Sequence, residues 1–282
     1  ANTTGQFNTS VGRNSMIANT TGANNVAVGN RALDANTTAN NNTAVGDAAL
    51  TANTTGTRNV SVGAIALDAN TTGDDNTAIG YTTLGLNVSG SRNTAVGTYA
   101  LDVNTASDNT AVGRAAMDAN TSGASNVAIG SSALGANTTA SNNTAVGMGA
   151  LAANTTASFN TAVGTSTLSA TTGEGNTVLG YAAGFAVTSG SNNNFFGRDA
   201  GRTGSPGGNV TTGGNNILLG DENIDYAGIQ VDWTVASDAR DKTDFTALDL
   251  GLDFVKALAP VTYRWDKRSK YGDKSADDYD LL

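Results

Sequence analysis

A five-residue phrase, Asn-Thr-Ala-Val-Gly, returns through most of the chain and constrains its fold more than any other feature. The phrase stands at residues 42–46, and it recurs with small changes from the first residues to Gly220. Nine of the twelve steps between its closing glycines are 17 residues long, two are 16 and the last is 23. A fixed period of this kind is typical of a solenoid, in which each repeat forms one coil of a stack. The closing glycines are Gly12, Gly29, Gly46, Gly63, Gly80, Gly97, Gly113, Gly130, Gly147, Gly164, Gly180, Gly197 and Gly220.

The idealised repeat predicts two short strands per coil, one around Thr-Ala-Val and one around x-Ala-Leu. The closing glycine would turn the chain after the first strand, and Asn-Thr-Thr-Gly would turn it back, because Gly and Asn accept turn conformations. Neighbouring residues of a strand point to opposite faces, so both faces carry apolar atoms. We expect the Val and Leu side chains inside each coil and the small Ala face against a neighbouring chain.

A single coil cannot fold alone. It buries about two large aliphatic side chains, worth roughly 1.5–3 kcal/mol each, whereas ordering its backbone costs on the order of 1–2 kcal/mol per residue. An Asn stands four residues before every closing glycine. Stacked coils would place these amides about 4.8 Å apart, so that each could donate to one neighbour and accept from the other. Paired Thr residues, such as Thr20-Thr21, would form either turn hydroxyls or a flat binding array.

The composition excludes several classes of function. The 282 residues contain no Cys and no His, so thiolate metal sites and Ser–His catalysis are absent. We expect no cofactor and no metal site. The net charge of −9 does not indicate the positively charged surface that binding of nucleic acid needs. No apolar run is long enough to span a membrane. The chain opens inside a repeat without a starting Met, so we expect a piece of a longer protein.

The repeat changes after Gly173. The residue two places before the closing glycine is small in the earlier repeats, and here it becomes Val178, Phe195 and Leu218. The residue four places after the closing glycine, which is Leu in most repeats, becomes glycine in two coils. This indicates a wider core or a different packing. The last step holds a six-residue insertion at residues 203–208, which we interpret as a surface loop or a binding loop.

After residue 220 the pattern ends. Residues 229–235 alternate like a strand and would form a neck. The apolar spacing in residues 246–258 predicts a helix that begins at Thr246 and ends before Pro260, and residues 261–265 read as a strand.

Two parts of the chain resemble known families. The coils look like the β-roll heads of trimeric autotransporter adhesins, and residues 176–184 resemble repeats that precede the C-terminal chaperone of phage tail fibres. The segment Ser-Asp-Ala-Arg-Asp-Lys-Thr-Asp at 237–244, followed by residues 252–265, is similar to the start of the self-cleaving intramolecular chaperones of tail fibres, tailspikes and endosialidases.

That resemblance implies a homotrimer that cuts its own chain between Ala236 and Ser237. Carried over by position, Ser237 would be the nucleophile and Lys242 its base, with Asp238 and Asp244 in support. A buried Lys that has lost its proton can activate a Ser in the absence of His. Without the surrounding pattern, this Ser and Lys would read as a polar loop. Because 46 residues follow the cleaved bond, we expect a shortened chaperone domain.

The sequence therefore predicts an all-β fold: a homotrimeric parallel β-solenoid, or β-roll, of about 17-residue coils with a short α+β C-terminal segment. We expect the solenoid at residues 1–220, the neck at 221–236 and the partial chaperone at 237–282. The expected function is host-cell attachment by a virion tail fibre or another extracellular fibre that binds a surface receptor or glycan. Enzymatic activity would be limited to the single self-cleavage. A bacterial trimeric adhesin and an ice- or polysaccharide-binding solenoid are the alternatives.

Overall fold

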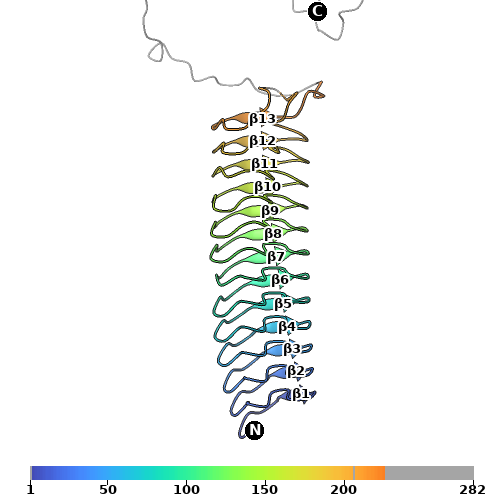
Figure 1. Cartoon of the computed structure of the whole chain (residues 1–282), viewed down its shortest axis with the longest axis vertical. Coiled ribbons are helices and arrows are strands. Elements are labelled where there is room, and N and C mark those ends of the chain that lie inside the picture. Colours follow the sequence, from blue (N-terminus) through green and yellow to red (C-terminus); the bar gives the residue numbers. More distant parts are fainter. Residues whose placement is uncertain (1, 206, 226–282) are drawn as a thin grey trace, which may run out of the picture. The chain divides into compact units, whose positions relative to one another are not determined.

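The computed structural model describes residues 2–205 and 207–225. Each repeat contributes one three-residue strand, and the thirteen strands form one parallel sheet in sequence order, as the solenoid prediction requires (Figure 1). No helix occurs in the described part of the chain. The strands are β1 (Thr9–Val11), β2 (Val26–Val28), β3 (Thr43–Val45), β4 (Val60–Val62), β5 (Thr77–Ile79), β6 (Thr94–Val96), β7 (Thr110–Val112), β8 (Val127–Ile129), β9 (Thr144–Val146), β10 (Thr161–Val163), β11 (Thr177–Leu179), β12 (Asn194–Phe196) and β13 (Ile217–Leu219).

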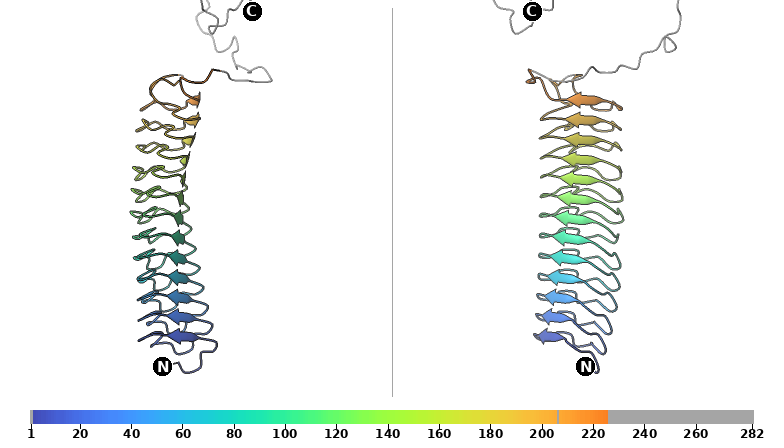
Figure 2. Two further views of the ribbon diagram at one scale, coloured as in Figure 1. Left: turned by 90° about the vertical axis from the view of Figure 1, so that its right-hand side faces the viewer. Right: turned by 180° about the vertical axis from the view of Figure 1, so that it is seen from behind.

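The pairing register repeats without slippage. Ala27 lies opposite Ala44, and Phe195 lies opposite Leu218 across the six-residue insertion. Seen edge-on, the strands follow one side of the stack and the turn segments follow the other (Figure 2). The chain divides into two units, Ala1–Ala227 and Gly228–Leu282, and the description here concerns the first. The predicted neck, helix and final strand lie outside the described residues.

The predicted second strand of each coil is wrong. In the x-Ala-Leu segment, φ is positive at two residues of the same turn, for example +58° at Arg31 and +55° at Leu33. An extended strand cannot contain such left-handed residues. The turn still bonds to its neighbours, because the Leu33 N–H donates to the Ala49 carbonyl (3.0 Å) and the Arg31 N–H to the Arg13 carbonyl (2.8 Å). Each coil is therefore one strand and one hydrogen-bonded turn segment.

The predicted inside and outside of the strand are also reversed. The central Ala of the strand and the Leu of the turn are fully buried, as Ala44 and Leu50 show, whereas Val45 lies on the outer face. The strand points its middle residue inward, and the Leu reaches back toward it from the turn. A coil with one strand is too narrow for two large side chains across its interior, so Ala faces Leu and the β-branched residues face outward.

The change of repeat after Gly173 is an exchange of volume across the same interior. Phe195 of β12 is fully buried, and a Cβ placed on Gly201 would lie 2.7 Å from its ring, while one on Gly184 would lie 3.4 Å from it. Gly184 and Gly201 occupy, in two successive coils, the position that holds Leu168 in the coil before them. The large side chain thus moves from the turn to the strand, which is the different packing that the change of repeat indicated.

Phe195→Ala is expected to destabilise the solenoid by about 3–5 kcal/mol, because the glycines opposite leave the resulting cavity unfilled. Thermal unfolding followed by circular dichroism measures the loss. Adding Gly201→Leu to this variant restores the Ala-opposite-Leu arrangement of the earlier coils and should recover part of the stability. A double variant no more stable than Phe195→Ala would contradict the volume exchange.

Two columns of buried Asn hold the coils together. In the predicted column, Asn42 accepts on Oδ1 from the Asn59 N–H (2.9 Å) and donates from Nδ2 to the Gly56 carbonyl (2.8 Å), so its bonds are mainly to backbone. The amide-to-amide bonds expected there form between some coils, as from Asn193 Nδ2 to Asn176 Oδ1 (3.0 Å). A second ladder of such bonds runs through the Asn of Asn-Thr-Thr-Gly. In that second column Asn70 donates to Asn53 (2.9 Å), and both are fully buried.

The second ladder is interrupted where the period falls to 16. The shortened coils follow Gly97 and Gly164, and in the coil before each of them a buried Asn carbonyl oxygen, of Asn87 or Asn154, has no hydrogen-bond partner among the described residues. After Asn154 the ladder ends, because the next coil places Thr171 at this position. A 16-residue separation by itself does not break the ladder, because Asn120 donates to Asn104, 16 residues earlier, at 2.7 Å.

Candidate functional site

The outer face of the sheet is a continuous uncharged strip. All thirteen strands end in Val, Ile, Leu or Phe, and they begin with Thr, Val, Asn or Ile. The end residues are partly or largely solvent-exposed in this single chain, with Ile79 at 40% and Ile129 at 41% of full exposure. At the strand spacing the strip is roughly 58 Å long. An exposed apolar surface of this length, without charged side chains, is typical of a protein interface.

The sequence identified the residues of this strip but placed them inside the coil. The alternation of apolar residues could not distinguish the two faces, because both are apolar. The signal that does distinguish them is residue size, since the inward residue stays small in the ten strands β1–β10 while the outward residues are β-branched or Thr. The candidate interface is thus the Val face and not the Ala face.

The Thr pairs divide into two roles. The first hydroxyl of the pair donates to a backbone carbonyl one coil later, as Thr20 does to Thr37 (3.0 Å) and Thr54 to Thr71 (3.0 Å). The second Thr, such as Thr21 or Thr38, is solvent-exposed. One row of hydroxyls therefore serves the stack, and a single row remains for solvent, which weakens the ice-binding alternative.

Three half-buried carboxylates follow one another along the turn segments. Burial raises the pKa of Asp68, Asp102 and Asp118, and the negative charges of Asp68 and Asp118 raise the pKa of Asp102 further. The Asp102 carboxylate lies over Gly85, which lacks the side chain that would displace it. By contrast, hydrogen bonds and charge from Arg92 lower the pKa of the exposed Asp108 carboxyl (2.6 Å).

Replacing the two kinds of carboxylate is expected to change the stability of the fold in opposite directions at pH 7. A raised folded-state pKa means that ionisation costs stability, and the cost grows as the pH rises through that pKa. Asp102→Asn should therefore stabilise the chain at pH 7 by a few tenths to about 1 kcal/mol, and the gain should vanish near pH 3. Asp108→Asn should destabilise it slightly at pH 7 and lose that effect as the pH falls through the lowered pKa. Thermal melts at several pH values test both, and equal profiles for the two variants would contradict the assignment.

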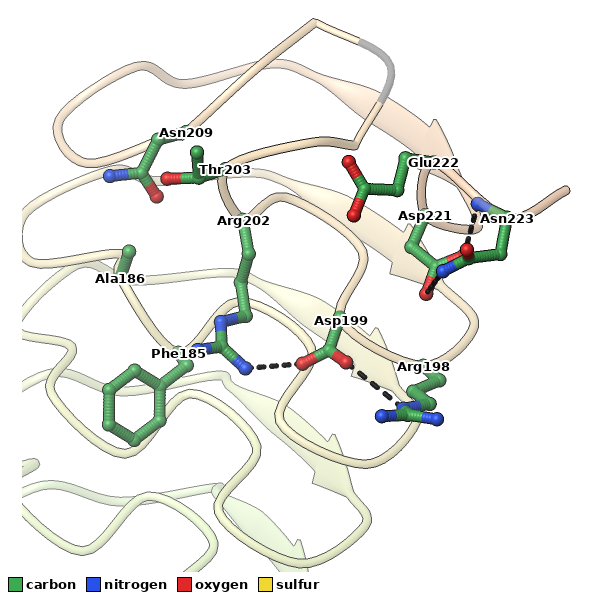
Figure 3. A pocket seen from close by; sticks show the side chains of 10 residues that line it. All are labelled: Phe185, Ala186, Arg198, Asp199, Arg202, Thr203, Asn209, Asp221, Glu222 and Asn223. Atoms are coloured by element: carbon green, nitrogen blue, oxygen red, sulfur yellow. Dashed lines mark hydrogen bonds and ion pairs between the residues drawn. The ribbon is translucent and has the colours of Figure 1, made fainter.

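A pocket of about 450 Å³ lies beside the insertion, at the C-terminal end of the described solenoid. Figure 3 shows side chains from three segments around it: the turn after β11, the turn after β12 with the insertion, and the residues after β13. The insertion closes on itself, because the Ser205 N–H donates to the Arg202 carbonyl (2.9 Å) and the Gly208 N–H donates to Ser205 (2.8 Å). It thus extends the coil without breaking the pairing of β12 with β13.

Ion pairs fix the cationic side chains of this pocket. Asp199 accepts from Arg198 Nε (3.0 Å) with one carboxylate oxygen and from Arg202 with the other. The Arg202 guanidinium also lies 5.2 Å from the ring centre of Phe185, within the range of a cation–π contact. On the opposite wall, the backbone and side-chain N–H groups of Asn223 hold the pKa of the Asp221 carboxyl below its usual value. Both Asp221 and Asp199 have fixed partners.

The predicted self-cleavage residues Ser237, Asp238, Lys242 and Asp244, and the bond after Ala236, lie outside the described residues. Their arrangement therefore stays a prediction. Within the described residues no group of three His, Cys, Asp or Glu side chains could hold a metal ion. That part of the chain also contains no helix with the length and hydropathy needed to cross a membrane.

Comparison with protein families identifies the C-terminal segment. Residues 237–279 match the family model described as the chaperone of endosialidase. The match begins at Ser237, where the sequence motif begins. The comparison with curated proteins gives no match, and neither does the comparison with solved structures. With a chaperone-of-endosialidase domain at its C-terminus and a parallel β-solenoid of 17-residue coils before it, the chain fits a tail fibre of the endosialidase type.

Proposed function

We propose that the chain is one subunit of a homotrimeric phage tail fibre that attaches the virion to its host cell. The observation that carries the proposal is the uncharged outer face, which runs over all thirteen strands. Three copies that turn this face toward a common axis would bury it. The family of the C-terminal domain is associated with trimerisation, and this supports three copies over two.

The C-terminal domain would assist assembly and then leave. In this proposal Lys242 accepts the proton of the Ser237 hydroxyl, whose oxygen attacks the Ala236 carbonyl carbon. The Ala236–Ser237 C–N bond breaks, the Ser237 nitrogen takes the proton, and water hydrolyses the resulting ester. Asp238 and Asp244 would position these groups. The products are a shaft that ends at Ala236 and a released chaperone that begins at Ser237.

Native and denaturing mass spectrometry of the expressed chain tests the assembly and the cleavage together. We expect trimers whose subunits end at Ala236, and Ser237→Ala should give trimers of whole chains. Wild-type trimers that consist of whole chains would support the trimeric fibre and refute self-cleavage. A stable monomer at micromolar concentration would refute the trimeric fibre.

Attachment is tested separately with the purified trimer. Fluorescently labelled trimers are expected to bind a subset of bacterial strains, because a fibre recognises particular surface molecules. Weak contacts would be multiplied by the three copies. Failure to bind any strain of a broad panel would argue for a purely structural fibre segment.

A further inference from the structure

The pocket beside the insertion contains polar side chains that the solenoid does not use. The Glu222 carboxylate, the Thr203 hydroxyl and the Asn209 amide line it, and none of them forms a hydrogen bond or ion pair with another residue in the described ranges 2–205 and 207–225. In Figure 3 the Glu222 side chain reaches from the segment after β13 toward the insertion. Gly204 makes room for it, because a Cβ on Gly204 would lie 2.8 Å from the Glu222 carboxyl carbon.

The same pocket supplies donors that are already held in place. A guanidinium group has five N–H donors, and the hydrogen bonds of Arg198 and Arg202 to Asp199 use one nitrogen of each. The ion pair with Asp199 and the ring of Phe185 restrain the Arg202 guanidinium, whereas the Arg198 side chain is 75% exposed and is held by its ion pair with Asp199. Fixed donors and free acceptors therefore face one volume of about 450 Å³.

Charge and polarity limit what this volume can bind. Two guanidinium groups and three carboxylates line it, so the pocket carries a net charge of −1. An anionic ligand is disfavoured, since Asp199 already neutralises the arginines. An apolar ligand is disfavoured too, because Phe185 and Ala186 are the only apolar side chains that residues 2–205 and 207–225 contribute to the lining. A peptide would need a strand edge or side-chain pockets, and the lining offers neither.

We propose that this pocket binds an uncharged saccharide. A sugar hydroxyl both donates and accepts, so it can bond to Glu222 and to a guanidinium nitrogen at once. The Phe185 side chain is 44% exposed, and its free part can pack against the C–H face of a sugar ring. The volume lies within the 300–1,000 Å³ of ordinary small-ligand sites. This inference rests on the proposed attachment function, for which it names a ligand class and a place.

The test compares binding of the full chain to an array of neutral, sialylated and other acidic glycans, with a basic peptide as a further probe. We expect neutral glycans to bind, and Glu222→Gln to weaken binding by about tenfold or more, since a hydrogen bond to a charged group is lost. Asn209→Ala should also weaken it. Glu174→Gln is the matched control, because Glu174 is exposed outside the pocket and its change alters the total charge equally.

The outcomes separate this inference from the proposed function. Binding of acidic glycans or of the basic peptide alone would overturn the ligand class. Glycan binding that is equal in wild type, Glu222→Gln and Asn209→Ala would overturn the site. If labelled trimers bind host cells but no variant of the pocket changes that binding, attachment stands and the pocket inference fails. If the trimers bind neither cells nor glycans, both fail.

Discussion

Gly130→Ala is expected to destabilise the solenoid by more than about 4–5 kcal/mol, the range that marks an exceptional single substitution. Gly130 has φ of +135°, a backbone conformation that residues with a side chain rarely adopt. An added Cβ would lie 2.6 Å from both the carbonyl carbon and the carbonyl oxygen of Gly147. The neighbour is backbone of the next coil, so it cannot move without breaking the pairing of β8 with β9.

Gly149→Ala is the matched control for this prediction. Its φ of +65° is left-handed, but its Cβ would meet nothing closer than Ser166 Oγ at 4.0 Å. Other coils carry Ala at the same position with positive φ, as at Ala48 (+53°) and Ala115 (+52°). We expect Gly149→Ala to change the unfolding temperature very little. Circular dichroism melts measure both variants, and comparable losses would show that the close approach of coils is not the cause.

The double variant Ile79→Lys/Ile129→Lys is expected to convert the trimer to monomers. Both residues lie on the outer face of the sheet. In a trimer each Lys would be buried beside its own copies, and the desolvation penalty in real proteins is several kcal/mol per ion. The isolated coil should keep its stability, because these side chains do not enter its core. Analytical ultracentrifugation gives the mass of the assembly.

Val88→Lys separates this effect from a general effect of added charge. Val88 is 46% exposed and belongs to the turn that follows the Asn ladder, away from the outer face. The Val88→Lys variant should leave the trimer intact. Trimers of unchanged stability with the Ile79→Lys/Ile129→Lys pair would mean that another surface joins the subunits.

The candidate sites differ in how far the sequence could predict them. The cleavage motif was visible because Ser237 and Lys242 stand in a fixed local pattern, and the family match begins at the same residue. The insertion was visible as a break in the period. The pocket beside it was not predicted, because Phe185, Arg202 and Glu222 come from three different coils and no local pattern connects them.

The sequence by itself determined the stack, its period, its buried Leu column and its Asn column. These follow from repetition, because an equal spacing places equal residues above one another whatever the path of the coil. Only the tertiary structure decided the path. It placed Ala44 inward and Val45 outward, and it gave Leu50 a left-handed backbone (φ +53°) in place of a second strand. The physical reason is that a single-strand coil has room for one large side chain in its cross-section, and a linear pattern that is apolar on both faces does not say which side chain that is.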